Sequence, residues 1–259
     1  MEPETGFSPT QLEAITSFLR QCAVPLVREE EDKLALLGTG SFFSFLGKLW
    51  LVTAAHCIRS PDDLKELAIP MRSARRFSTL GNCCLVKPSN SAIDVAVVLL
   101  EDHELATCAS QNWQMLDESN IWPGNTSTSQ FVVAGYPREI LAKTQLVWAK
   151  AFTQIYTGPY SGPTGTASLH PQLLLNYART APGPLGDAST TPDLGGLSGA
   201  CVWAVVHRPD GLWAPERVLQ LAGVQSSFKH SAYIRAELWQ TVLEVIRRWS
   251  VEESTPSKQ

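Results

Sequence analysis

A serine set among glycines is the feature of this chain best suited to covalent chemistry. Ser198 stands in the run 195–199, which reads Gly-Gly-Leu-Ser-Gly, and an apolar run over 201–206 follows at once. A serine hydroxyl becomes an effective nucleophile only where a neighbouring base can take its proton. The stretch therefore predicts a nucleophile on a turn that leads into a strand.

Two earlier segments offer the groups that would activate this serine. His56 ends the apolar run 51–55, and Asp94 opens the apolar run 95–100. Histidine, with an unperturbed pKa of about 6.5, can accept a proton near neutral pH. A carboxylate beside its other ring nitrogen fixes the tautomer and stabilises the imidazolium formed during attack. The order of the three residue types along the chain is His, Asp, Ser.

This order, in these local settings, resembles the trypsin-like serine peptidases, which have the chymotrypsin fold. The matching segments extend from about residue 38 to residue 225, which is most of the chain. The resemblance implies an all-β fold of two six-stranded antiparallel β-barrels. It also implies that His56 is the general base, Asp94 its orienting partner and Ser198 the nucleophile. Singly, each segment has a plainer interpretation as a turn, a half-buried histidine or a strand cap.

The glycine before Leu197 has a predicted role of its own. Gly196 can adopt backbone angles that other residues avoid, so its N–H can point with that of Ser198 at the oxygen that becomes negative during attack. These two amides are the predicted oxyanion hole. Leu197 itself departs from the family's secreted members, which have an aspartate there to pair with a newly cut N-terminus. We therefore expect a bacterial or HtrA-like type that needs no zymogen cleavage.

Substrate recognition is expected from two segments that flank the serine. Ser226, Ser227 and Phe228 resemble the strand that pairs with substrate main chain beside the specificity pocket. By its offset from the serine, the pair Pro192 and Asp193 is expected near the floor of that pocket. Asp193 favours a basic substrate side chain, whereas Phe228 narrows the entrance. These two indications conflict, and a small or uncharged side chain before the scissile bond is preferred.

Composition agrees with one soluble globular domain. The chain has 259 residues, 44% of them hydrophobic, with 17 glycines and 17 prolines spread between short apolar runs, a pattern typical of many strands joined by turns. The net charge of −4 argues against nucleic acid as the main partner, since such binding depends on clustered Lys and Arg. No membrane association is expected either.

The N-terminus and the cysteines indicate the cellular compartment, and the spacing of cysteines and histidines bears on metal binding. Residues 1–4 are acidic where a secretory signal would be basic, so we expect a cytoplasmic protein. Cys57 lacks the upstream partner that many secreted relatives have, and reduced thiols are expected for all six cysteines. No metal-ligand spacing occurs, so neither metal nor cofactor is predicted.

A single peptidase domain spanning 1–259 is predicted, with no appended PDZ domain. Its expected parts are a helix over 8–22, a first barrel over 23–117, a second over 118–230, a closing helix over 231–249 and a frayed tail over 250–259. Two stretches have loop composition, 157–166 and 180–194. The second leads directly into the serine turn, where it is either a gate for the site or a plain surface loop.

Three functional classes remain open from the sequence. The first is a serine endopeptidase that cleaves a specific polypeptide through an acyl-enzyme and is controlled by loop ordering or by an activating or inhibiting partner protein. The second is a catalytically silent binding module on the same fold. The third is an esterase-type acyl hydrolase that uses the same triad.

Overall fold

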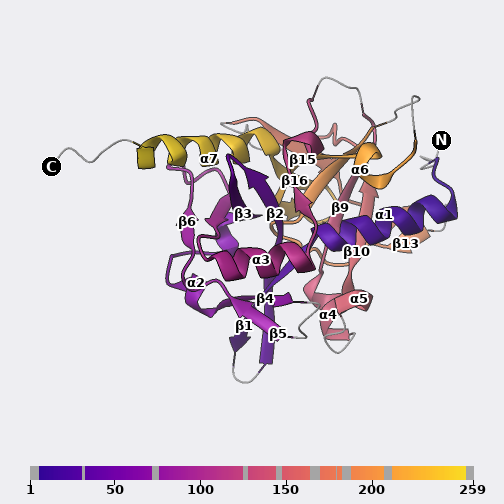
Figure 1. The fold of residues 1–259 in the computed structure, drawn as a ribbon. Coiled ribbons are helices and arrows are strands. Elements are labelled where there is room, and N and C mark those ends of the chain that lie inside the picture. Colours follow the sequence, from indigo (N-terminus) through magenta and orange to yellow (C-terminus); the bar gives the residue numbers. More distant parts are fainter. Residues whose placement is uncertain are drawn as a thin grey trace.

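The computed structural model describes residues 6–30, 33–71, 76–124, 128–143, 148–163, 170–178, 180–182, 188–206 and 212–254. These residues form two curled antiparallel sheets, each a half-barrel, with a helix before them and a helix after them (Figure 1). The all-β, two-barrel fold class is therefore confirmed.

The first sheet has eight strands in the described part of the chain, where six were expected. Its central strand is β2, whose first half pairs with β1 and whose second half pairs with β3. The short β8 adds a parallel pairing to β2. The strands are β1 (Val24–Glu30), β2 (Lys33–Phe45), β3 (Lys48–Thr53), β4 (Leu67–Met71), β5 (Arg76–Thr79), β6 (Cys84–Val86), β7 (Ala96–Leu99) and β8 (Met115–Leu116).

The second sheet has six strands in the order β10-β9-β14-β15-β16-β11. Every residue of β9 and of β14 is buried, because both strands are central and both of their faces are covered. The strands are β9 (Phe131–Gly135), β10 (Thr153–Thr157), β11 (Gln172–Asn176), β14 (Cys201–Val205), β15 (Leu219–Lys229) and β16 (Tyr233–Leu238). The apolar run 131–135 thus forms a central strand of this sheet.

Helix α1 (Pro9–Cys22) begins as its sequence predicts. The Ser8 hydroxyl accepts a hydrogen bond from the N–H of Gln11, and the Gln11 side chain accepts one from the N–H of Ser8. Leu12, Ile15 and Leu19 are buried on one face, and Phe18 packs edge-on against Trp203 of β14 at 5.6 Å between ring centroids. The helix therefore seals one side of the second sheet.

The closing helix differs from its prediction. It is α7 (Trp239–Ser254), and residues 233–238 form the strand β16 instead of the first turns of a helix. Strand β16 is paired on both sides, with β15 and β11, and is buried on both faces. Apolar residues therefore occupy neighbouring positions along it, and some of them match a helical spacing. The helix also continues to Ser254. The frayed tail expected over 250–259 is therefore wrong for 250–254, which are helical, and the remaining residues, 255–259, lie outside the described residues.

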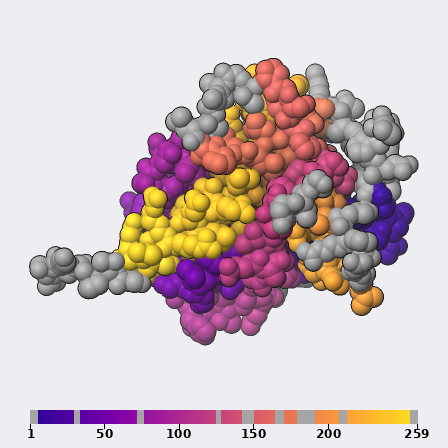
Figure 2. All heavy atoms as spheres, turned by 90° about the horizontal axis from the view of Figure 1, so that it is seen from above, coloured from indigo at the N-terminus to yellow at the C-terminus, as the bar shows by residue number. Residues whose placement is uncertain are grey.

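Helix α7 connects the two sheets. It contacts β6 and β7 of the first sheet and β15 and β16 of the second. Its Trp239 packs against Phe43 of β2 with ring centroids 5.2 Å apart. Figure 2 shows α7, in yellow, lying against purple and magenta atoms of the first half of the chain. Residues of both sheets, α1 and α7 share one buried apolar cluster, so the halves fold around a common core.

One connecting segment has more regular structure than its composition predicts. The stretch 180–194, expected to lack regular structure, contains the two-stranded hairpin of β12 (Thr180–Pro182) and β13 (Ala188–Thr190). Residues 148–151 form a helical turn shortly before β10. The further helices and 3-10 turns are α2 (Asp63–Glu66), α3 (His103–Asn112), α4 (Arg138–Lys143), α5 (Trp148–Ala151), α6 (Pro215–Val218), η1 (Ala55–Cys57) and η2 (Glu118–Asn120).

We predict that packing of α1 is a large part of the stability of the domain. Ile15 is fully buried, so Ile15→Ala should lower the free energy of unfolding by about 2–5 kcal/mol. Glu13→Ala, on the exposed side of the same helix, is the matched control and should change it little. Urea denaturation followed by circular dichroism measures both, and equal effects would show that α1 is not part of the cooperative core.

Candidate active site

His56 lies on a short turn held at both ends. It occupies the middle of η1, directly after β3, with buried Ala54 before it and buried Cys57 after it. The Cys57 thiol is 3.6 Å from the carbonyl oxygen of Ser198. The side chain of His56 itself is 51% exposed, so its ring can be reached by a substrate.

Asp94 reaches His56 because β3 and β7 are neighbours. Thr53, at the end of β3, is paired with Ala96, at the start of β7. One carboxylate oxygen of Asp94 accepts the backbone N–H of His56 at 3.0 Å, and the other lies 2.6 Å from Nδ1 of the ring. With both oxygens used, the imidazole is fixed with Nε2 directed away from Asp94.

The electrostatics of this pair favour a charged ring. The hydrogen bond to Asp94 is the largest influence, and an interaction with the Cys57 thiol adds to it. Together they raise the pKa of His56 from 6.5 to about 10, although partial burial acts in the opposite direction. A raised pKa favours the protonated ring at neutral pH, whereas the ring can act as a base only in its neutral form.

The serine turn is held by backbone hydrogen bonds. The N–H of Leu197 donates to Leu194, and the N–H of Ala200 donates to Leu197. The carbonyl oxygen of Ser198 accepts the N–H of Thr39 at 2.8 Å, and Gly199 donates to Gln225 of β15 at 2.8 Å. The turn is thereby attached to the first sheet on one side and to β15 on the other.

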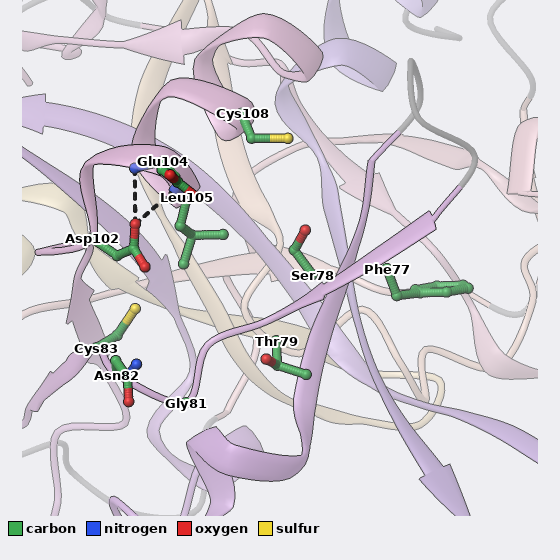
Figure 3. Close-up of a pocket in the computed structure, with 10 residues that line it drawn as sticks. All are labelled: Phe77, Ser78, Thr79, Gly81, Asn82, Cys83, Asp102, Glu104, Leu105 and Cys108. Atoms are coloured by element: carbon green, nitrogen blue, oxygen red, sulfur yellow. Dashed lines mark hydrogen bonds between the residues drawn. The ribbon is translucent and has the colours of Figure 1, made fainter.

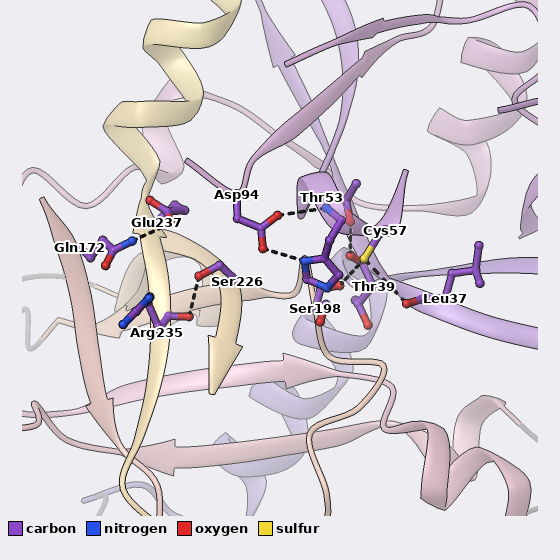
Figure 4. Close-up of polar contacts among 11 residues, drawn as sticks. Leu37, Thr39, Thr53, Cys57, Asp94, Gln172, Ser198, Ser226, Arg235 and Glu237 are labelled. Atoms are coloured by element: carbon purple, nitrogen blue, oxygen red, sulfur yellow. Dashed lines mark hydrogen bonds and ion pairs between the residues drawn. The ribbon is translucent and has the colours of Figure 1, made fainter. Parts of the chain in front are cut away.

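Thr39 is the residue of β2 that secures this turn, and the sequence analysis did not identify it. Its hydroxyl donates to the carbonyl oxygen of Gly196 at 2.9 Å and accepts the N–H of Tyr136 at 3.3 Å. Its carbonyl oxygen accepts the hydroxyl of Thr53 at 2.8 Å. The only sequence signal was the pair of glycines on either side of it, which permit close approach of another backbone. Figure 4 shows Thr39, Cys57 and Ser198 side by side.

Two glycines of the turn have no possible replacement in this conformation. Gly196 has φ +98°, and a Cβ there would lie 2.7 Å from the carbonyl oxygen of Tyr136. Gly199 has φ +87°, and a Cβ there would collide with the carbonyl oxygen of Thr39. Both angles lie in the left-handed region that glycine adopts readily. The predicted need for Gly196 thus has a geometric basis.

The amides expected to form the oxyanion hole have no other role in the described structure. The N–H groups of Gly196 and Ser198 make no hydrogen bond with any described residue. The carbonyl oxygen of Gly195 accepts the N–H of Arg138 at 2.6 Å. Because a trans peptide directs its N–H opposite to its C=O, the N–H of Gly196 points away from Arg138. Two donors are therefore available beside Ser198.

The remaining contact of interest is the one between the Ser198 hydroxyl and His56. Within the described residues, the hydroxyl of Ser198 makes no hydrogen bond with His56 or with any other group. Such contacts are commonly long in enzymes without substrate and shorten when substrate is bound. The structure thus brings His56 and Asp94 into direct contact. The carbonyl oxygen of Ser198 contacts Cys57, the neighbour of His56, and Thr39 of β2.

The residues expected to bind substrate differ in their exposure and in their hydrogen-bond partners. Ser226 is buried and its hydroxyl donates to a carbonyl oxygen of β16 at 3.3 Å, while Ser227 is exposed. Phe228 is half-buried, and the carbonyl oxygen of Pro192 accepts the hydroxyl of Tyr177. Asp193, expected near a pocket floor, is instead exposed, and its carboxylate accepts the N–H of the next-but-one residue at 2.7 Å. That aspartate orders the turn.

A hollow of about 480 Å³ lies elsewhere on the molecule (Figure 3). Its walls come from β5, the turn after it and the start of α3, and no candidate site residue contributes to them. Asp102, the acidic group most evident there, is already engaged as the cap of α3, where it accepts two backbone N–H groups. This hollow therefore has no visible connection to the chemistry of Ser198.

Other kinds of site find little basis in the structure. In the described part of the chain, no group of three or more His, Cys, Asp or Glu side chains is placed to hold a metal ion. Of the helices described, none is long and apolar enough to cross a membrane. The six cysteines are all described, and none is joined in a disulfide.

Comparison with known proteins adds evidence on the fold. No family model matches the chain, and no curated protein matches it by sequence. The fold is a common one, since 256 chains of solved structures match it. One is described as "Aromatic interactions drive the coupled folding and binding of the intrinsically disordered Sesbania mosaic virus VPg protein", with TM-score 0.50 and 13% identity over 86% of this chain and 89% of that chain. That likeness shows the fold alone.

We predict that the Thr39 hydroxyl stabilises the serine turn. Thr39→Val keeps the shape of the side chain but leaves the buried carbonyl oxygen of Gly196 without its donor, which should lower the free energy of unfolding by about 1–3 kcal/mol. Thr39→Ser keeps the hydroxyl and is the control. Urea denaturation of both variants is the measurement, and a valine variant as stable as the serine variant would contradict the assignment.

We also predict that Asp94 sets the titration of His56. NMR of the imidazole ring should show a pKa near 10 in the wild type and a much lower value in Asp94→Asn, because the asparagine has no charge to stabilise the imidazolium. A raised pKa in the folded state stabilises the fold fully below pH of about 6.5, and this contribution is lost as pH rises through about 10. An ordinary pKa in the wild type would refute the prediction.

Proposed function

We propose that this protein is a serine endopeptidase that forms an acyl-enzyme at Ser198. The observation that supports it most is the contact of His56 Nδ1 with Asp94 at 2.6 Å, beside a serine turn whose Gly196 and Ser198 amides are unused. These are the base, the orienting group, the nucleophile and the oxyanion donors of a triad mechanism. The likeness in fold does not by itself argue for an enzyme.

The first half of the reaction uses each of these groups once. Neutral His56 takes the proton of the Ser198 hydroxyl through Nε2, while the Ser198 oxygen forms a bond to the carbonyl carbon of the substrate. The amides of Gly196 and Ser198 hydrogen-bond the oxygen that becomes negative. The imidazolium, stabilised by Asp94, then gives its proton to the leaving amine as the peptide bond breaks.

The second half of the reaction returns the enzyme to its starting state. Water enters in place of the amine and gives a proton to His56 as its oxygen attacks the ester carbon. The bond to Ser198 then breaks, and the serine oxygen recovers its proton from the imidazolium. Since both halves need neutral His56, and its pKa is raised to about 10, activity should increase with pH over the neutral and mildly alkaline range.

A polypeptide substrate is favoured by the free edge of β15. On its β14 side, the described strands pair with β15 only up to Val224, and Gln225 adds the last backbone contact, with Ala200. Residues 226–228 are therefore open to pairing by an extended chain. This edge lies beside the serine turn, as cleavage of a peptide bond requires.

The serine turn also bears on how activity would be controlled. Leu197 is fully buried in an apolar cluster, where an aspartate able to pair with a cut N-terminus would be costly. Together with the ordering of the turn by Arg138 and Asp193, this supports activity without N-terminal cleavage. Restraint by a partner protein or by ordering of the segment before Ser198, and a cytoplasmic setting, remain predictions.

The proposal predicts covalent labelling of Ser198. A fluorophosphonate probe should react with Ser198, as located by peptide mass spectrometry, and Ser198→Ala and His56→Ala should each abolish the reaction. The matched control is Ser110→Ala, which changes an exposed serine of α3.

Each result of this experiment selects a functional class. Labelling of Ser198 together with cleavage of peptides supports the endopeptidase. Labelling with hydrolysis of simple esters alone supports an acyl hydrolase. No labelling even at about pH 10, where His56 is about half deprotonated, would indicate a catalytically silent binding module.

A further inference from the structure

Gln225 is a buried polar residue whose side chain makes no hydrogen bond in the described structure. It is 0% exposed, and within the described structure neither its side-chain nitrogen nor its side-chain oxygen has a hydrogen-bond partner. Buried polar groups are nearly always paired, so an exception of this kind calls for an explanation in terms of function.

The backbone of Gln225 lies directly against the serine turn. Its N–H donates to the carbonyl oxygen of Ala200, and its carbonyl oxygen accepts the N–H of Gly199, both at 2.8 Å. These two residues follow Ser198 without interruption. The position of the Gln225 side chain is therefore fixed relative to the nucleophile by two hydrogen bonds.

Strand pairing shows where this side chain points. Residues that oppose one another on neighbouring antiparallel strands direct their side chains to the same face. Gln225 is paired with Ala236 of β16 and continues the register in which Val224 opposes Cys201, so that it also opposes Ala200. Both alanines belong to the inner apolar cluster of the second sheet. The Gln225 amide therefore points into that cluster.

The same cluster meets both segments expected to contact substrate. Phe228 packs against it from the open end of β15, and its ring lies edge-on to Tyr177, with centroids 5.7 Å apart. The hydroxyl of Tyr177 in turn donates to the carbonyl oxygen of Pro192 at 2.9 Å. Pro192 and Phe228 are thus joined through Tyr177 at the edge of the cluster that holds the Gln225 amide.

We propose that the Gln225 amide recognises the substrate side chain just before the scissile bond and selects a carboxamide, that of glutamine or asparagine. This rests on the proposed peptidase function. A carboxamide both donates and accepts, so a second carboxamide can pair with both the nitrogen and the oxygen of Gln225. A carboxylate only accepts and an ammonium only donates, and either would leave one buried atom of Gln225 unpaired. The exposed Asp193 offers no such buried partner for a basic side chain.

Two peptides that differ in one side chain test this selectivity. Quenched fluorescent peptides carry glutamine or methionine before the scissile bond, since methionine has a similar length without the amide. The wild type should cleave the glutamine peptide with a kcat/KM at least about tenfold higher, because the methionine peptide leaves Gln225 unpaired. Peptides with glutamate and lysine should fall below glutamine as well.

Variants of two glutamines on the same strand complete the test. Gln225→Met should bring the ratio of kcat/KM for the two peptides to about one or below. Gln220→Met, which changes a buried glutamine earlier on β15, should keep the wild-type ratio. A ratio near one in the wild type, with Ser198 still labelled by fluorophosphonate, would overturn this inference and leave the peptidase proposal intact. Absence of labelling would overturn both.

Discussion

One buried threonine holds the candidate site together. Thr39 lies on the central strand of the first sheet, yet it binds the carbonyl oxygens of both Ser198 and Gly196, which lie just before β14 of the second sheet. Because His56 and Asp94 lie at the ends of strands of the first sheet, and Ser198 leads into β14 of the second, the position of Ser198 relative to His56 depends on this junction. The glycines around it, such as Gly199, are required because any Cβ would occupy the space of Thr39.

The apolar core makes this junction possible. Helices α1 and α7 and both sheets contribute to one cluster, so neither half can shift without opening a shared core. Leu197 adds to the inner cluster of the second sheet from within the serine turn itself. The turn is therefore ordered by packing and by Thr39.

The sequence was sufficient for what depends on local pattern. Apolar runs separated by turns predicted an all-β fold, and the stretch 8–22 was predicted as a helix, which is α1. The settings of His56 and Asp94 predicted two residues that the fold brings into contact. It failed where a signal depends on distant partners. Ile234 looks helical because β16 is buried on both faces, and Gln225 is notable only once its pairing with Ala200 and Ala236 is known.

The central claim is that Ser198, His56 and the two unused amides act on one carbonyl group. A crystal structure of the protein after reaction with a phosphonate inhibitor tests it most directly. We expect phosphorus bonded to the Ser198 oxygen, with a phosphoryl oxygen within hydrogen-bond distance of the N–H groups of both Gly196 and Ser198. The N–H of Gly196 should still be directed away from Arg138. A phosphoryl oxygen bound by neither amide, or an adduct on another residue, would contradict it.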